Sequence, residues 1–310
     1  MSWELPLRSK SKKTWSRPKR PLALCLGETS WDIRWVVEHL PGTVTDTFAS
    51  EVSEGPGGCA ANTALDLAIR GYRSHLLGNT LGKDKNGHLL AKIIRKTGVE
   101  FHSTSTSSSA TPICQVFVEE KGADRCFALY HKSVATFDRA ATKKLRTRAI
   151  SGDFQAIFVQ CYPRTLAQAF LMGAKFPLGT FLMTQDLPPT DPLIRCFDMI
   201  QISWPEEKPA TQKSVVKAAT SYFVGRCTSL IITQGSRGAW LIESGKKPLR
   251  LAAKKIRGRI VDTTGCGDAF RAGLMAGILD GKNFTESAAR GARWGAEKAR
   301  MKGSNFLDEI

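Results

Sequence analysis

The strongest constraint on the fold is a regular alternation of short apolar runs with helical patterns from residue 21 onward. Runs such as PLALCLG (21–27), AIFVQCY (156–162) and SLIITQG (229–235) have the length and composition of buried strands. Amphipathic segments lie between such runs, and two of them end at Gly71 and Gly98, as helices often do. Strands that alternate with helices predict a Rossmann-like αβα three-layer domain built on a mainly parallel sheet.

Two stretches do not fit a parallel sheet. TVTDTFASEV alternates β-branched or apolar residues with polar ones, and TPICQVFVEEKGADRCFALY (111–130) has the pattern of a hairpin around EKGADR. We expect residues of about 33–53 and 112–130 to form a small β-sheet lid on a single domain of residues 21–310. Later helices are predicted at 164–175, near 206–223, at 268–279 and at 286–302.

The formal net charge of +17 restricts the binding partners. Residues 1–20 carry seven lysines and arginines against Glu4, so this segment holds +6 and the rest of the chain +11. Its few apolar residues predict a disordered basic arm. A basic protein attracts polyanions, including ATP and sugar phosphates. We find no helix-turn-helix, zinc-finger or RNP-type motif, so we do not expect nucleic acid to be the ligand.

The eight cysteines and the hydropathy exclude several other classes. No cysteine belongs to a CxxC pair or lies at zinc-ligand spacing from a histidine. We therefore expect reduced core thiols and no disulfide framework or metal–thiolate site. No apolar run approaches the ~20 residues of a transmembrane helix. The N-terminus does not resemble a secretory signal either, so we expect a cytoplasmic protein without a membrane partner.

The segment VDTTGCGDAFRAGLMAG (261–277) carries the clearest chemical signal. Gly265 and Gly267 flank Cys266 directly before a predicted helix, so their backbone N–H groups can converge beside the positive end of the helix dipole. Such an anion hole can stabilise a developing phosphoryl charge. Asp268, in the first helical turn, can accept a proton from an attacking hydroxyl. The alternative is that Asp268 only caps the helix.

This segment resembles the second signature of the ribokinase-like (PfkB) carbohydrate kinase family. Four further segments resemble the family's motifs and occur in its order: GETSWD (27–32), GGCAAN (57–62), GNTLGKDKNG (78–87) and IITQGSRGA (231–239). The resemblance covers about residues 21–303. It implies a ribokinase-like fold with a β-sheet lid, which often forms a homodimer surface. It also implies transfer of the ATP γ-phosphoryl group to a hydroxyl of a sugar or sugar-like molecule, helped by Mg²⁺.

The resemblance assigns roles to residues at the matching positions. Asp268 is the expected general base, and the backbone of Gly265, Cys266 and Gly267 is the expected anion hole. The remaining assignments are Asp32, Gly57, Gly58 and Asn62 to the substrate, and Thr233, Gly235 and Gly238 to the nucleotide.

One family motif is altered, and another implies a cation. The family's magnesium-associated NxxE appears as Ser203-Trp204-Pro205-Glu206, with Ser where Asn is usual. Glu206 remains the candidate that organises Mg²⁺ through water. Asp262 and Thr264 occupy positions that help to bind a monovalent cation in some relatives, which makes K⁺ a further candidate cofactor.

Other functions remain as alternatives. A nucleoside kinase would use the same scaffold, and a binding or regulatory protein could retain the fold without catalysis. Gly55, Gly57 and Ala60 satisfy the GxGxxG/A fingerprint of a dinucleotide-dependent oxidoreductase, but the preceding segment is polar and alternating, and the required acidic residue is missing. A P-loop kinase is excluded because the chain has no GxxxxGK[ST].

Overall fold

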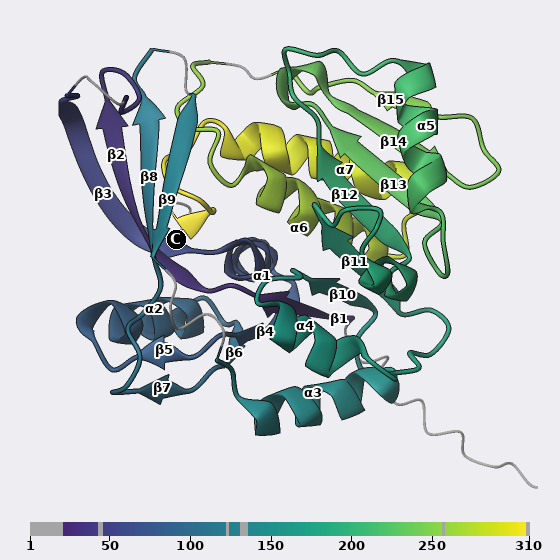
Figure 1. Ribbon diagram of the computed structural model, residues 1–310, viewed down its shortest axis with the longest axis horizontal. Coiled ribbons are helices and arrows are strands. Elements are labelled where there is room, and N and C mark those ends of the chain that lie inside the picture. Colours follow the sequence, from purple (N-terminus) through teal and green to yellow (C-terminus); the bar gives the residue numbers. More distant parts are fainter. Residues whose placement is uncertain (1–20, 43–45, 122–123, 131–135, 256–257, 308–310) are drawn as a thin grey trace, which may run out of the picture.

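A nine-stranded sheet forms the centre of the molecule (Figure 1). The computed structural model describes residues 21–42, 46–121, 124–130, 136–255 and 258–307, so the predicted basic arm lies outside the described residues. The strands, in spatial order, are β15 (Leu249–Leu251), β14 (Ala239–Glu243), β13 (Ser229–Thr233), β12 (Met199–Ser203), β11 (Phe181–Gln185), β10 (Ala156–Val159), β1 (Leu22–Gly27), β4 (Arg73–Gly78) and β6 (Glu100–His102). Seven pair in parallel, from β13 to β6, while β14 and β15 add antiparallel pairs at one edge.

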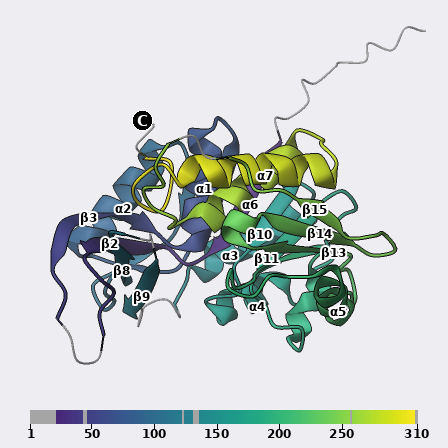
Figure 2. The same cartoon turned by 90° about the horizontal axis from the view of Figure 1, so that it is seen from above.

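Helices cover both faces of this sheet, as Figure 2 shows from above. One face carries α1 (Cys59–Ile69), α2 (Lys85–Lys96), α6 (Cys266–Leu279) and α7 (Phe284–Lys298). The other face carries α3 (Arg139–Ile150), α4 (Arg164–Leu171) and α5 (Gln212–Tyr222). The predicted α/β architecture with a mainly parallel sheet is therefore confirmed. No helix of the described residues has both the length and the apolar composition needed to cross a membrane.

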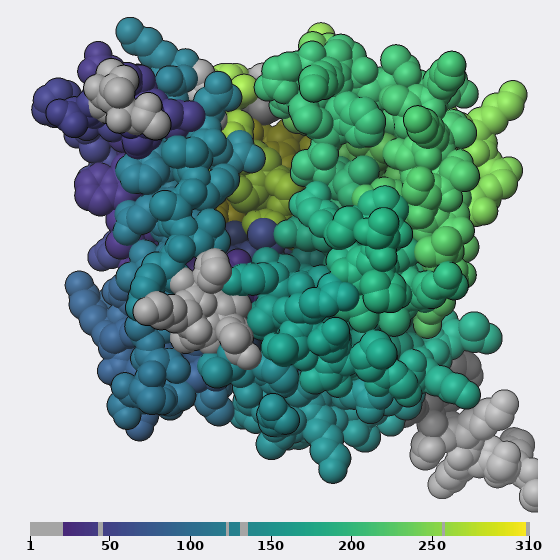
Figure 3. Space-filling view, in the orientation of Figure 1, coloured from purple at the N-terminus to yellow at the C-terminus, as the bar shows by residue number. Residues whose placement is uncertain are grey.

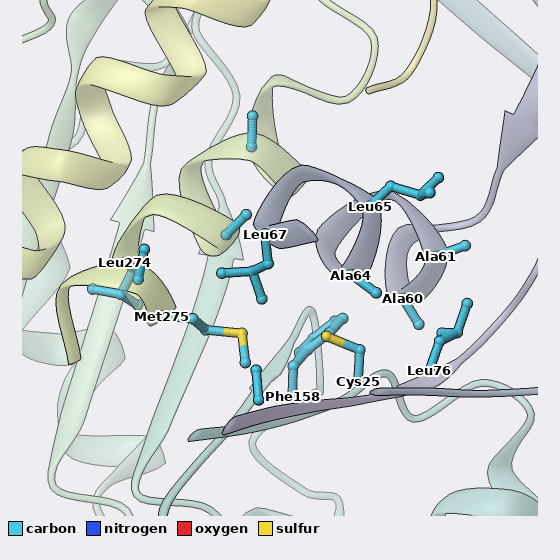
Figure 4. Close-up of a cluster of buried hydrophobic side chains, with 14 of the residues drawn as sticks. Cys25, Ala60, Ala61, Ala64, Leu65, Leu67, Leu76, Phe158, Leu274 and Met275 are labelled. Carbon is cyan, nitrogen blue, oxygen red and sulfur yellow. The ribbon is translucent and has the colours of Figure 1, made fainter. Parts of the chain in front are cut away.

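Strand β1 explains how the sheet is buried on both faces. Its residues alternate between two apolar cores, because successive side chains of a strand point to opposite faces. Leu22, Leu24 and Leu26 pack with α3 and α4, whereas Ala23 and Cys25 pack with α1 and α6. Figure 4 shows the second core, in which small residues of α1 and two apolar residues of α6 lie over Cys25, Leu76 and Phe158.

A second, four-stranded sheet projects from the main domain and forms the lid. Its order is β3 (Ala49–Gly57), β2 (Ser30–Val37), β8 (Ile113–Glu119) and β9 (Arg125–Tyr130). The short strands β5 (Leu81–Gly82) and β7 (Ser105–Thr106) form a separate two-stranded sheet. Strand β2 follows β1 after two residues, so the lid is joined directly to the centre of the main sheet.

Helix boundaries differ from the predictions where local chemistry ends or starts a helix. The helix predicted near 206–223 begins only at Gln212, because Thr211 forms a capping box and Pro209 lies just before it. The last helix starts at Phe284 and ends at Lys298, with Asn283 forming the N-terminal capping box. Helix α4 ends at Leu171 rather than at residue 175.

Helices α6 and α7 pack closely because glycines face each other across their interface. A Cβ atom on Gly291 would lie 2.5 Å from the carbonyl oxygen of Phe270, and one on Gly273 would lie 2.9 Å from the Cα of Gly291. Backbone atoms cannot move aside as side chains do. This contact therefore sets the separation of the two helices and the position of the α6 N-terminus.

We expect Gly291→Ala to destabilise the protein. Overpacking of a close interface costs about 1–3 kcal/mol, which exceeds the gain of about 0.5–1 kcal/mol in helix propensity. Gly55→Ala is the matched control, since nothing lies within 4 Å of its added Cβ. Urea unfolding of both variants measures the difference, and equal stabilities would contradict the packing argument.

Candidate active site

The predicted motifs converge at the carboxyl ends of the parallel strands. In the space-filling view, a hollow lies between the lid and the main domain, and its floor has the colours of the segment that includes α6 (Figure 3). Gln160 follows β10, Gln185 ends β11 and Gln201 lies on β12, and each bonds to a residue of this region. In open α/β sheets, ligands bind in the crevice at this edge.

Asp268 lies in the first turn of α6 and is held by two donors from different parts of the chain. Its Oδ2 accepts a hydrogen bond from Asn62 Nδ2 at 2.9 Å, and its Oδ1 accepts one from Arg271 Nη1 at 3.0 Å. Asn62 lies on α1, and its Oδ1 accepts from Asn305 Nδ2 at 3.2 Å. Asp268 is 7% exposed, so it is largely buried without being fully closed off from solvent.

Arg271 was not identified from the sequence, although it contacts the predicted base. Its side chain is 2% exposed and carries a permanent charge. Nη1 also donates to Thr63 Oγ1 at 3.1 Å, Nη2 donates to Gln185, and the guanidinium lies 4.2 Å from the ring centroid of Phe158. This set of contacts fixes Arg271 and, through it, the direction of the Asp268 carboxylate.

The backbone before Asp268 presents N–H groups at the start of α6. Gly265 adopts the left-handed conformation (φ 75°), and a Cβ there would lie 1.9 Å from the carbonyl oxygen of Ser304. Cys266 N donates to Thr263 O at 3.3 Å, and Ala269 N donates to Gly265 O at 2.8 Å. The first N–H groups of a helix have no partner within the helix. Of the predicted anion-hole residues, Cys266 thus already donates to Thr263, and the N–H groups of Gly267 and Asp268 lie between these two donors in the first turn of α6.

The Asp32 side chain can lie where it does only because residue 57 is glycine. Asp32 lies on β2, and its carboxylate occupies the space beside Gly57, where a Cβ would lie 1.8 Å from Asp32 Oδ1. Oδ2 accepts from Ser304 Oγ at 2.8 Å and Oδ1 from Ser30 Oγ at 3.1 Å. Burial raises the pKa of Asp32 to about 6 despite these two hydrogen bonds, and the nearby Asp268 contributes to the rise.

Glu28 is a further acidic group that sequence reasoning missed. It lies directly after β1, is 7% exposed, and accepts a long hydrogen bond of 3.5 Å from Gln160 Nε2. Burial raises the pKa of Glu28 to about 7, and the charge of Asp32 adds to this effect. Gly58 packs on the backbone here, since a Cβ would lie 2.5 Å from Glu28 O. Glu28, Asp32 and Asp268 thus bring several carboxyl groups into one region.

The predicted nucleotide residues form a turn at the end of β13. Thr233 ends that strand, the turn η2 (Gly235–Arg237) follows, and Gly238 has φ 83°. Glu206 packs against this turn, accepting hydrogen bonds from Ser236 N at 3.1 Å and from Ser236 Oγ at 3.0 Å. The neighbouring strand β12 reaches α6, because Gln201 Nε2 contacts Gly267 O at 3.5 Å. The turn and the α6 N-terminus therefore border the same edge of the sheet.

A pocket of about 320 Å³ adjoins this edge beside β10 and β11. Its lining includes Gln160 and Gln185, the residues that bond to Glu28 and Arg271. Asp186 also lines it, and its Oδ1 accepts from Ser203 N at 3.1 Å. The other carboxylate of the lining, Asp191, is paired with Arg164, so Asp186 is the one that could contribute to holding Mg²⁺, which proteins commonly bind by one or two carboxylates together with substrate phosphates. Asp186 was not identified from the sequence.

The environment of Asp262 and Thr264 does not fit a monovalent cation. Asp262 is fully buried, and its Oδ2 accepts from Arg34 Nε at 2.6 Å and from Gly303 N at 3.2 Å. Its Oδ1 accepts from Thr264 N at 2.8 Å. The only anionic group at the predicted ligand positions is thus already paired with a guanidinium. Thr264 Oγ1 is buried without a hydrogen-bond partner in the described part of the chain, so the side chains at these two positions offer a single unpaired oxygen.

The missed residues had different signals in the sequence. Arg271 stands alone among apolar residues in a predicted helix, three positions after Asp268, and this pattern could have identified it as a buried partner. Arg34, Gln185 and Asn305 reach the site only through tertiary contacts, and no local pattern distinguishes them.

Comparisons with known proteins agree with the fold and identify a family. Residues 20–309 match the family described as pfkB family carbohydrate kinase. The chain is 25% identical over 277 residues to probable fructokinase-3 of Arabidopsis thaliana, covering 82% of this chain and 79% of that protein. It is 22% identical over 290 residues to a nucleoside kinase of Methanocaldococcus jannaschii, covering 90% of each chain. The solved ribokinase of Arabidopsis thaliana, complexed with ribose and ATP, has the same fold, with a TM-score of 0.70, 19% identity and coverage of 92% of this chain and 94% of that one.

We expect Glu28→Gln to change how stability depends on pH. Because the folded pKa is raised from 4.5 to about 7, the folded state binds more protons than the unfolded state between these values. Stability is therefore lost as pH rises through this window, by on the order of 3 kcal/mol. Glu28→Gln should remove most of this loss, and exposed Glu38→Gln is the control. Denaturant unfolding at pH 5 and pH 8 measures this loss of stability. If the stability of Glu28→Gln depended on pH as that of the wild type does, the expectation would be refuted.

Proposed function

Because the chain belongs to the PfkB family of carbohydrate kinases, we propose that it transfers the γ-phosphoryl group of ATP to a hydroxyl of a sugar or sugar-like molecule. The contact between Asn62 and Asp268 supports this most directly. It joins the predicted substrate loop to the predicted base across 206 residues, at 2.9 Å. A helix cap alone would need no such partner.

Asp268 is the general base in this proposal. Its carboxylate is oriented by Arg271 and Asn62, and each oxygen keeps a further lone pair for a substrate hydroxyl. As the hydroxyl oxygen bonds to the γ-phosphorus, its proton passes to Asp268, the bond between the γ-phosphorus and the bridging oxygen of ATP breaks, and ADP leaves. The N–H groups of Gly267 and Asp268, at the positive end of α6, stabilise the charge on the transferred phosphoryl group. The reaction then depends mostly on positioning and charge stabilisation.

Substrate hydroxyls are held by the neighbouring polar groups. Asp32 accepts hydrogen bonds from vicinal hydroxyls, Asn62 contributes its amide, and the backbone at Gly57 and Gly58 allows close approach. ATP lies along the turn of Thr233, Gly235 and Gly238. Glu206 would help to hold Mg²⁺, which would supply positive charge to the phosphates when bound.

Asp268→Asn tests the base. We expect kcat to fall by ~10²–10⁴, because the amide cannot accept the proton, while the fold and ATP binding persist. Asp280→Asn is the matched control, since Asp280 caps the other end of α6 and bonds to Tyr72 and Arg290. Turnover within a few-fold of wild type would refute the assignment. A protein that binds ATP and sugar without any turnover would favour the regulatory alternative.

The lid leaves a nucleoside as the second candidate acceptor. Cross-strand pairing places Leu129 opposite Cys114 and Phe127 opposite Val116, on the same lid face as Asp32 and Arg34. Phe127 and Leu129 are 48% and 50% exposed, so an apolar wall stands beside the substrate carboxylates. A nucleobase would bury such a wall, whereas a free sugar would cover less of it.

A thermal-shift screen with sugars and nucleosides decides between these acceptors, because a ligand that binds the folded state raises Tm. We then expect Asp32→Asn and Asn62→Ala to abolish most of the shift caused by the true acceptor and to spare the shift caused by ATP. Loss of the ATP shift alone would show that these residues belong to the nucleotide half of the cleft. Exposed Glu38→Gln again serves as the control.

A further inference from the structure

The buried ion pair between Arg34 and Asp262 lies at the start of the loop that forms the anion hole. Arg34 is 5% exposed, Asp262 is fully buried, and their side chains meet at 2.6 Å. We propose that Arg34 permanently takes the place of the monovalent cation that the family implies at Asp262, so that this kinase works without K⁺. This inference rests on the proposed function for its catalytic consequence.

The pair leaves no electrostatic role for a dissociable cation at Asp262. A guanidinium remains charged at every physiological pH. Its Nη1 also lies 3.5 Å from Glu51 Oε1, so carboxylates of the lid and of the loop both lie within ion-pair distance of Arg34. Cations held by proteins need several oxygen ligands, but the Asp262 oxygens already accept three hydrogen bonds. Another buried cation lies shortly before Gly303 in the chain. It is Lys298, the last residue of α7, and its Nζ donates to Met301 O at 3.2 Å.

The ion pair also connects the lid to the catalytic loop. Arg34 lies on β2, two residues after Asp32, whereas Asp262 precedes Thr263 and Gly265. A second lid arginine, Arg125, donates from Nη1 to Thr263 Oγ1. The position of the loop before α6 therefore depends on charges carried by lid strands.

The wild-type protein provides the first test. Its Tm should be the same, and its kcat/KM should agree within about twofold, between KCl, NaCl and tetramethylammonium chloride at equal ionic strength, because general screening is then the same. A Tm that rises selectively with K⁺, or a gain in kcat/KM of about tenfold or more, would overturn the proposal.

Substitution of Arg34 provides the second test. Arg34→Met leaves Asp262 buried and unpaired, so Tm in tetramethylammonium chloride should fall, and K⁺ should selectively restore part of the Tm and of kcat/KM. Lys302→Met is the matched control: it removes the exposed cation that bonds to Glu51 at 2.7 Å, and it should show no selective K⁺ effect. If the Tm of Arg34→Met fell and K⁺ did not restore it, the proposal that Arg34 takes the place of a monovalent cation would be overturned.

A double variant covers the case in which Arg34→Met does not fold. Arg34→Met with Asp262→Asn removes both buried charges, so it should fold more stably than Arg34→Met and show no selective K⁺ effect on Tm. A selective K⁺ effect in the double variant would contradict the role of the Asp262 charge. If no sugar or nucleoside is phosphorylated in any salt, the proposed function fails, while the Tm comparisons still decide the role of Arg34.

Discussion

Burial of the Asp268 carboxylate depends on the donors that meet it from two directions. An ionised carboxylate is costly to bury unless it is paired and hydrogen-bonded. Arg271 supplies the charge from the same helix, and Asn62 supplies an amide from α1. Each donor is itself fixed by further polar residues, Gln185 for Arg271 and Asn305 for Asn62. The polar centre of the site is therefore one connected network in which the loss of one member leaves another unpaired.

The backbone of the site likewise depends on glycines, whose missing side chains leave room for neighbouring groups. The carboxylate of Asp32 fits only because residue 57 has no side chain, and the turn before α6 fits against Ser304 only because residue 265 has none. The position of α6 in turn depends on the contact of Gly291 with Phe270 in the helix interface. Small residues thus determine where the charged residues can lie.

The sequence alone was sufficient for the architecture. Alternating apolar runs and glycine-terminated helices predicted the parallel sheet with helices on both faces, and the alternating polar stretches predicted a separate small sheet. Motifs with local geometry, such as the glycines before Asp268, were also readable because a turn followed by a helix has a recognisable pattern. Boundaries were less accurate, as at Gln212, because Pro209 and the Thr211 capping box compete with the helical periodicity.

Contacts between distant segments were not predictable in this way. Arg34 and Asp262 are 228 residues apart, and nothing in either neighbourhood identifies the other as its partner. No role was predicted for Glu28 from the sequence, and only the packed structure shows that it is buried and close enough to Asp32 for the two charges to interact. The roles of these residues follow from how the lid meets the main domain, which is a property of tertiary packing rather than of local pattern.

The Arg34–Asp262 pair also limits how this protein can be recombined with its relatives. A lid exchanged for one that lacks a cation at this position would arrive without the charge that Asp262 requires, even if every strand paired correctly. The main domain would then contain an intact Asp268 and an unsupported loop before it. The lid and the main domain are therefore separate sheets, but they cannot be exchanged independently between relatives. A functional chimera must take residues 34 and 262 from the same protein.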